Sequence, residues 1–434
     1  MGGPRTNSHA PAGMPSYADV LRTRGFVPAF LALSISTWGD YIARIAVALV
    51  VRERTGSDLA MAATFTASLL PSILGRSLLS PLADRIPYKH VLVGSDLVRG
   101  IFVLAILAAV AQDSRVWLLL VLLFALELFG GPAGASVQIL LTDLFEDRRA
   151  FLRARGLFSL AEQVNQAIGL AVGGIIVTAL SAHGALLVDL GTFLVSAALF
   201  AVAVKARPVS GIPTPGIVGF FRDIADGARY LARHRVLLSL LTLSLFAMWG
   251  IVAPEAVAIP YVLGNGLPQW LGGVLMAAPV SGAVAGLVMV GRWQPEAASS
   301  RMIAMALLMP VPLIVSALVP PSTGWLPVVW LLWFLSGVLQ AFVLPLQATF
   351  ALVVEPDMRG RVIGLAGAAS MTAAALGFLL AGWLSESLTP RVAVAGCAAL
   401  SLAGVALLAA TWPARSLDDA VDVAFNGELN EGDR

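Results

Sequence analysis

The sequence has 434 residues, of which 58% are hydrophobic and 12% charged, with a mean hydropathy of +0.85 and a formal net charge of +2 at pH 7. A water-soluble domain of this size does not carry so many apolar residues, so the composition indicates a membrane protein and argues against a nucleic-acid-binding protein. The single cysteine, Cys397, excludes a disulfide within the chain and argues against a cysteine-based metal site.

Twelve apolar stretches, each long enough to cross a bilayer, follow one another along the chain. They are continuous rather than alternating, so we expect helices and not barrel strands. The first stretch is too long for the core of a signal peptide, and we expect an uncleaved first span. The expected spans are 27–51, 60–83, 91–112, 116–140, 157–180, 184–204, 236–262, 268–291, 302–319, 325–354, 362–384 and 391–412.

The longest internal polar stretch divides these spans into six and six. Its second part places apolar residues at helical spacing, which predicts an amphipathic helix that lies on the membrane surface or covers the end of the bundle. The expected regions are an N-terminal tail (1–26), a first six-helix half (27–204), a linker with the amphipathic helix (205–235), a second six-helix half (236–412) and an acidic C-terminal tail (413–434).

The basic residues predict the orientation in the membrane. Of the 28 Lys and Arg residues, 21 fall in the two tails and in the loops after even-numbered spans, four fall in the other loops and three fall within spans. Basic loops stay on the cytoplasmic side. We therefore expect a multi-pass protein of the cell (inner) membrane with both termini in the cytoplasm.

Four of the charged residues within the expected spans lie on the first, fourth and seventh spans, where an ionised side chain costs on the order of 3 kcal/mol. Asp40 and Arg44 are four residues apart on one helix face and are expected to pair, either as a static structural pair or as part of a substrate or proton site. Glu127 has no cation three or four residues away on its own helix, and Glu255 follows Pro254. Either carboxyl is expected to exchange a proton or to remain permanently protonated.

The loop after the second span carries a family resemblance. "SPLADRIPYKH", residues 80–90, resembles the signature loop of the major facilitator superfamily, but it departs from that pattern at Ser80, Pro87 and Tyr88. The resemblance implies an all-α membrane fold of twelve transmembrane helices in two six-helix halves. It also implies a charged gate near the cytoplasmic ends of the second and third spans, formed by Asp84, Arg85, Lys89, Asp96 and Arg99.

Further stretches resemble the drug-exporter branch that includes the macrolide and enterobactin efflux proteins. The fifth span also contains part of the glycine pattern of antiporters, "GLAVGG" at residues 169–174, without its proline. The matching residues are Gly39, Asp40, Thr55, Gly56 and Ser57; Asp96 and Arg99; Asp189 and Phe193; Asp226, Gly227, Arg229 and Tyr230; and Arg359, Gly360 and Arg361.

In the superfamily that this chain resembles, spans 1, 4, 7 and 10 line a central cavity. The expected proton-coupling residues are Glu127, Asp40 and Glu255. The expected cavity residues are Asp40, Arg44, Glu127, Glu255, Gln340, Gln347, Trp38 and Trp249, although simple packing would also explain the two tryptophans.

The sequence thus predicts a proton-coupled exporter of an amphipathic or apolar organic compound that works by alternating access. A lysolipid or siderophore transporter on the same fold, acting as a flippase or an uptake carrier, remains the alternative. The chain lacks the motifs of ATP-binding and catalytic sites, so we expect no enzyme activity, no metal and no cofactor. The expected partners are a small-molecule substrate, protons and the lipid bilayer, with the protein as a monomer.

Overall fold

The computed structural model describes residues 17–78, 86–145, 147–204, 217–293 and 295–412. All the secondary structure in this part of the chain is helical. The helices are α1 (Tyr17–Arg22), α2 (Phe26–Thr55), α3 (Asp58–Leu78), α5 (Tyr88–Ala111), α6 (Val116–Leu128), α7 (Gly130–Leu144), α8 (Arg148–Ala203), α9 (Ile217–Arg233), α10 (Arg235–Gly264), α11 (Trp270–Val290), α12 (Pro295–Leu308), α13 (Pro310–Ser316), α14 (Leu326–Leu339), η1 (Gln340–Phe342), α15 (Val343–Val353), η2 (Pro356–Met358), α16 (Arg359–Ser387) and α17 (Pro390–Ala410).

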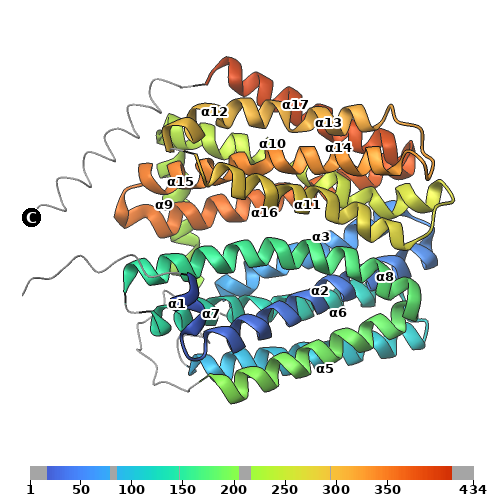
Figure 1. Cartoon of the computed structure of the whole chain (residues 1–434), viewed down its shortest axis with the longest axis horizontal. Helices are drawn as coiled ribbons and strands as arrows, with labels where there is room; N and C mark the ends of the chain where they lie inside the picture. The colour runs from blue at the N-terminus through green and yellow to red at the C-terminus, as the bar shows by residue number, and fades with distance from the viewer. Residues whose placement is uncertain (1–16, 79–85, 146, 205–216, 294, 413–434) are drawn as a thin grey trace, which may run out of the picture.

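The helices form two groups that lie side by side (Figure 1). We refer to α2–α8 as the N-terminal half and to α10–α17 as the C-terminal half. Helix α8 has two arms that meet at Ser181, whose backbone is not helical (φ 63°, ψ 173°), and the chain turns back there. Helix α9 packs on α16, with Gly227 close to the backbone of Arg361, and so covers one end of the C-terminal half.

Nine helical segments of the described chain are long and apolar enough to cross a membrane. One of them, Ala150–Ala203, contains both arms of α8, and a shorter apolar segment runs from Ser300 to Ser316. Many large apolar side chains are exposed on the surface, such as Val202, Leu318 and Leu407, as lipid-facing residues are. The expected all-helical membrane fold is confirmed, whereas the count of twelve spans stays a prediction.

The fourth apolar stretch forms two helices, α6 and α7, with a break at Phe129 between them. Pro132 has no N–H to donate to the carbonyl of Leu128, and Gly75 of α3 has no side chain, so α3 packs directly against that carbonyl. The Ser95 hydroxyl donates to the carbonyl of Phe129 at the break. The glycines and the proline of this stretch predict such a kink, and α6 ends one residue after Glu127.

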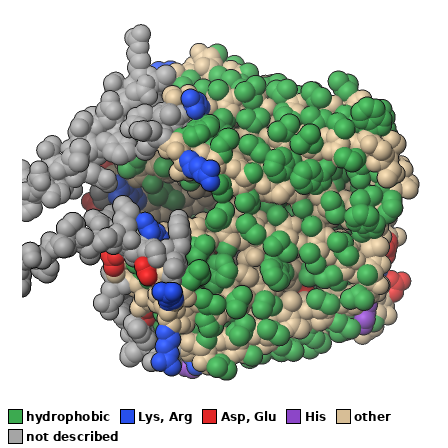
Figure 2. Space-filling model, viewed as in Figure 1, with side chains coloured by type: hydrophobic (Ala, Val, Ile, Leu, Met, Phe, Trp, Pro, Cys, Tyr) green, Lys and Arg blue, Asp and Glu red, His purple; other side chains and the backbone are tan. Residues whose placement is uncertain are grey.

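Figure 2 shows hydrophobic side chains over most of one face, with Lys and Arg side chains gathered near one end of the molecule. We refer to this as the basic end, and it includes the start of α2 and helix α9. The surface is hollowed between the two halves at this end. The opposite end includes the C-terminus of α2, the turn at Ser181 and the C-terminus of α16.

Candidate functional site

The two charges of α2 do not pair with each other, contrary to the expectation from their spacing. The Asp40 carboxylate accepts a hydrogen bond from the Arg99 guanidinium of α5, with 2.5 Å between the two atoms. The Arg44 guanidinium donates to the Glu127 carboxylate of α6 at 2.9 Å. Each charge on α2 therefore pairs with a residue of a neighbouring helix, Asp40 with α5 and Arg44 with α6.

Glu127 has two cations near it, so the expectation of an unpaired carboxyl is wrong. Its second oxygen lies 4.0 Å from the Arg99 guanidinium. Asp40, Arg44, Arg99 and Glu127 form one connected group, which we call the charge cluster. The role of Glu127 in proton coupling stays a prediction.

Aromatic rings cover the two guanidinium groups of the charge cluster. The central carbon of Arg44 lies 4.9 Å from the centre of the Tyr41 ring, and that of Arg99 lies 4.5 Å from the centre of the Phe193 ring. A guanidinium that stacks on a ring keeps its edge free for carboxylates while its face is shielded from lipid. The two rings therefore hold the arginines in the interior of the N-terminal half.

Two more acids lie beside the charge cluster. Asp96 of α5 is 4% exposed and Asp189 of α8 is fully buried. The role of Asp96 in a cytoplasmic gate stays a prediction. Asp189 packs against α2 at Gly39, where a Cβ atom would overlap the carboxyl group. The sequence shows both residues, but it does not show that they face the same interior as Asp40.

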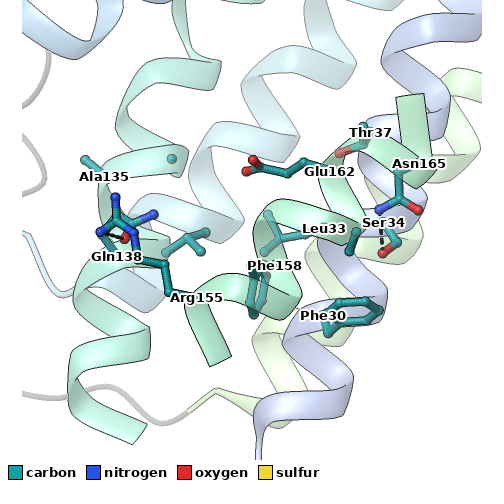
Figure 3. Close-up of a pocket in the computed structure, with 13 residues that line it drawn as sticks. Phe30, Leu33, Ser34, Thr37, Ala135, Gln138, Arg155, Phe158, Glu162 and Asn165 are labelled. Atoms are coloured by element: carbon teal, nitrogen blue, oxygen red, sulfur yellow. Dashed lines mark hydrogen bonds between the residues drawn. The ribbon is translucent and has the colours of Figure 1, made fainter. Parts of the chain in front are cut away.

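Two cavities in the N-terminal half lead toward the charge cluster. The first, which we call the vestibule, has a volume of about 360 Å³ between α2, α7 and α8 (Figure 3). The second, the charged cavity, has a volume of about 220 Å³, and Asp40, Asp96, Arg99 and Glu127 are in its wall. Leu33, Thr37 and Gly134 line both cavities, so the two spaces adjoin.

The vestibule has apolar, aromatic and polar walls. Phe30 and Phe158 lie on one side of it, and Glu162 extends into it from α8 (Figure 3). The lining residue Asn165 accepts the indole N–H of Trp38, which itself lines neither cavity, at 3.0 Å, and the Asn165 amide donates to Ser34 at 2.9 Å. A wall of this mixed chemistry suits an amphipathic organic molecule.

The remaining expected site residues are more dispersed. Glu255 of α10 is partly buried and interacts electrostatically with Arg44 across the boundary between the halves. Trp249, Gln340 and Gln347 are not among the residues that line the vestibule or the charged cavity. The indole N–H of Trp249 is buried and has no acceptor among the described residues.

The expected gate at the basic end is only partly within the described structure. Asp84 and Arg85 lie outside the described residues. Lys89 lies in the first turn of α5, whereas Arg99 lies ten residues further along the helix, about 15 Å deeper. Arg99 thus lies with the charge cluster and not at the end of the helix, and its role in a gate stays a prediction.

At the opposite end, polar side chains of the two halves are bonded to each other. The Ser385 hydroxyl donates to Asp58 at 2.6 Å, and Arg52 donates to the other oxygen of Asp58 at 2.8 Å. The Glu386 carboxylate accepts from the Ser57 hydroxyl and from the backbone N–H of Leu59 at 3.0 Å. We call this group the polar clasp. It links the start of α3 to the end of α16.

Replacing Glu386 with glutamine is expected to open the opposite end more readily, because the clasp loses the negative charge that faces the N-terminus of α3. The labelling rate of a cysteine placed at Thr66, whose hydroxyl donates to Ala375 of the other half, should rise about two- to fivefold. Cys397 is fully buried, so thiol reagents report on the new cysteine. Glu53→Gln, at an exposed carboxylate of the same end, is the control, and equal rates for the two variants would contradict the role of the clasp.

Glycines allow the halves to approach closely at the opposite end. Gly174 of α8 and Gly273 of α11 face each other, and a Cβ atom on Gly174 would lie 2.8 Å from the Cα atom of Gly273. The nearby glycines of the "GLAVGG" stretch pack elsewhere, with Gly169 against Tyr41 and Gly173 against Ile45. The opposite end is therefore closed by backbone contact and by the polar clasp, while the basic end is hollowed.

The comparisons with known proteins agree with this architecture. The family model described as Major Facilitator Superfamily matches residues 29–352. The multidrug efflux pump Tap of Mycolicibacterium fortuitum is 25% identical over 369 residues, which cover 82% of this chain and 88% of that protein. Macrolide efflux protein A of Streptococcus pyogenes is 22% identical over 367 residues, with 82% and 88% covered.

The similar solved structures support the fold. The nucleoside transporter NupG superposes with a TM-score of 0.70 at 12% identity, covering 89% of this chain and 99% of that structure. An inward-facing bacterial homolog of the human lysosomal transporter Spinster superposes with a TM-score of 0.62 at 15% identity, with 92% and 95% covered. Together with the family model, which matches well over half of the sequence, these findings show that the chain belongs to the major facilitator superfamily, as a transporter whose relatives include drug efflux pumps.

Proposed function

We propose that this transporter exports an amphipathic or apolar organic compound in exchange for protons, by alternating access. The observation that carries the proposal is the position of the charge cluster, three of whose residues (Asp40, Arg99 and Glu127) line a cavity that adjoins the vestibule. Buried carboxylates beside such a space provide sites for protons and for polar groups of a substrate. The names of the relatives, a multidrug efflux pump and a macrolide efflux protein, favour export.

The shape of the molecule supports a state that is open toward the cytoplasm. The halves touch through Gly174, Gly273 and the polar clasp at the opposite end, and the hollow lies at the basic end (Figure 2). Basic residues gather on the cytoplasmic side of membrane proteins. In the proposed cycle, the substrate enters the vestibule from the cytoplasm, and the opposite end then opens as the basic end closes.

One proton per cycle supplies enough energy for this exchange. Moving one charge across about 100 mV provides roughly 2.3 kcal/mol, and a pH difference of one unit adds about 1.4 kcal/mol. Together they sustain a concentration gradient of about several hundred-fold for a neutral substrate. Asp40, Glu127 and Glu255 remain the proposed coupling residues, and one chain suffices because it contains both cavities.

The test is uptake of a radiolabelled macrolide into inverted membrane vesicles, with and without a protonophore. Uptake that requires the protein and stops with the protonophore supports proton-coupled export. Uptake that persists with the protonophore would contradict the coupling. Movement of a fluorescent lysolipid between leaflets, without macrolide uptake, would instead favour the flippase function.

Replacing Gly134 with leucine is expected to block transport without unfolding the protein. Gly134 lines both cavities, and an added Cβ atom has no heavy atom within 4 Å, so the larger side chain fills the junction without a clash. Uptake should fall by about tenfold or more, because the route between the two spaces is obstructed. Gly94→Leu on α5, where a Cβ atom also has free space, is the control. Normal uptake by the Gly134 variant would exclude this route.

A further inference from the structure

Asp189 is a buried carboxyl group that lacks the usual partners of an anion. It lies in the second arm of α8 and is fully buried. Its Oδ1 atom lies 3.4 Å from the Thr192 hydroxyl, but this hydroxyl donates its proton to the carbonyl of Asp189 itself at 2.7 Å. Its Oδ2 atom has no hydrogen-bond partner among the described residues.

The charged groups around Asp189 do not compensate a negative charge there. Asp40 of α2 and Glu127 of α6 repel it, and Asp96 of α5 adds a further acid beside the same cluster. The nearest cation is Arg99 of α5, which is already bonded to Asp40 and lies 4.0 Å from Glu127. An ionised carboxylate with neither a cation nor a donor is strongly disfavoured in a protein interior.

The number of charges leads to the same conclusion. Among the side chains that the structure describes, the interior of the N-terminal half brings together four acids (Asp40, Asp96, Glu127 and Asp189) and two cations (Arg44 and Arg99). Both cations are bonded to Asp40 and Glu127. Two acids are therefore left without a cation, and of these Asp96 is in the wall of the charged cavity, whereas Asp189 is shielded behind Gly39 and Arg99.

We propose that Asp189 carries the exchanged proton in this state, and that Arg99 is the switch that releases it. This inference rests on the proposed function: it places the carried proton on Asp189, while Asp40 and Glu127 couple its release to the substrate. A substrate that engages Asp40 or Glu127 competes with Arg99 for these carboxylates, and the freed guanidinium then favours ionised Asp189. The O–H bond of the carboxyl group breaks, and the proton passes to water through the charged cavity, where Asp40 and Arg99 are in the wall.

The first experiment measures the protonation of Asp189 without any substrate. The infrared spectrum of the purified protein should contain the carbonyl band of protonated carboxyl groups at neutral pH, and D189N should lose part of it. E127Q is the control and should keep the band unchanged, because both oxygens of Glu127 face arginine guanidinium groups. A band that D189N leaves intact would overturn the proposal.

The second experiment uses stability and transport together. The amide of asparagine mimics a protonated carboxyl, so D189N should unfold at the same temperature as the wild type or higher, whereas E127Q should unfold at a lower one. In proteoliposomes, D189N should exchange macrolide for macrolide at a rate that no longer depends on pH, and it should not drive macrolide against its gradient. A destabilised D189N, or a variant that keeps uphill transport, would overturn the proposal.

The wild-type measurements separate this proposal from the proposed function. If the wild-type protein moves macrolide but ignores the proton gradient, proton-coupled export itself is wrong. If the wild type is coupled and D189N is coupled equally well, only the role of Asp189 is wrong.

Discussion

Replacing Gly273 with leucine is expected to hold the opposite end open and to abolish export. A side chain on Gly273 would overlap the backbone of α8, at the carbonyl of Leu170 and at Gly174, so the two helices must separate. Overpacking of this kind costs about 1–3 kcal/mol. The closed arrangement of the opposite end should therefore become about tenfold or more less populated relative to the open one.

Two measurements check this result. Macrolide uptake by inverted vesicles should be lost, and a cysteine at Thr66 should react with a thiol reagent added on the side of the opposite end. Gly264→Leu is the control. Gly264 is the last residue of α10, just before the loop that leads into α11, and an added Cβ atom has free space there. Full export by the Gly273 variant, with a protected cysteine, would show that the halves can close without this contact.

Replacing Arg99 with glutamine is expected to have the second large effect. The substitution leaves the partly buried Asp40 beside other acids without its bonded cation, and it removes the stacking on Phe193. Removing one partner of a buried ion pair destabilises a protein by about 3–5 kcal/mol. We expect a clearly lower unfolding temperature and no export, while lysine at the same position restores only part of both, because an ammonium group cannot present the planar fork of arginine.

A double substitution tests whether the loss comes from the pair. Asp40→Asn together with Arg99→Gln should be more stable than Arg99→Gln alone, since the uncompensated carboxylate is gone. The matched control is Arg229→Gln, which breaks an exposed ion pair with Asp226 on α9 and should change stability little. If the single Arg99 variant were as stable as the wild type, the charge cluster would contribute nothing to folding.

The sequence predicts the helices well because their signals are local. Hydropathy is sufficient for spans such as α2 and α10, and the run of Gly130, Gly131 and Pro132 predicts the break between α6 and α7. Spacing on one helix also suggests that Asp40 and Arg44 share a face. The family resemblance is confirmed over residues 29–352.

The partners in the site could not be predicted in this way, because they come from distant parts of the chain. Glu127 is 83 residues from Arg44, and Arg99 is 59 residues from Asp40. The sequence has no cation within four residues of Glu127, although two arginines lie beside it once the helices pack. The polar clasp joins residues 327 positions apart, Asp58 and Ser385, and nothing in either segment alone indicates the other.

The charge cluster belongs almost entirely to the N-terminal half, and Glu255 is the main acidic contribution from the C-terminal half. If the proposed function holds, a chimera that keeps the first half and takes the second from a related exporter is expected to respond to the same proton gradient while it accepts a different cargo.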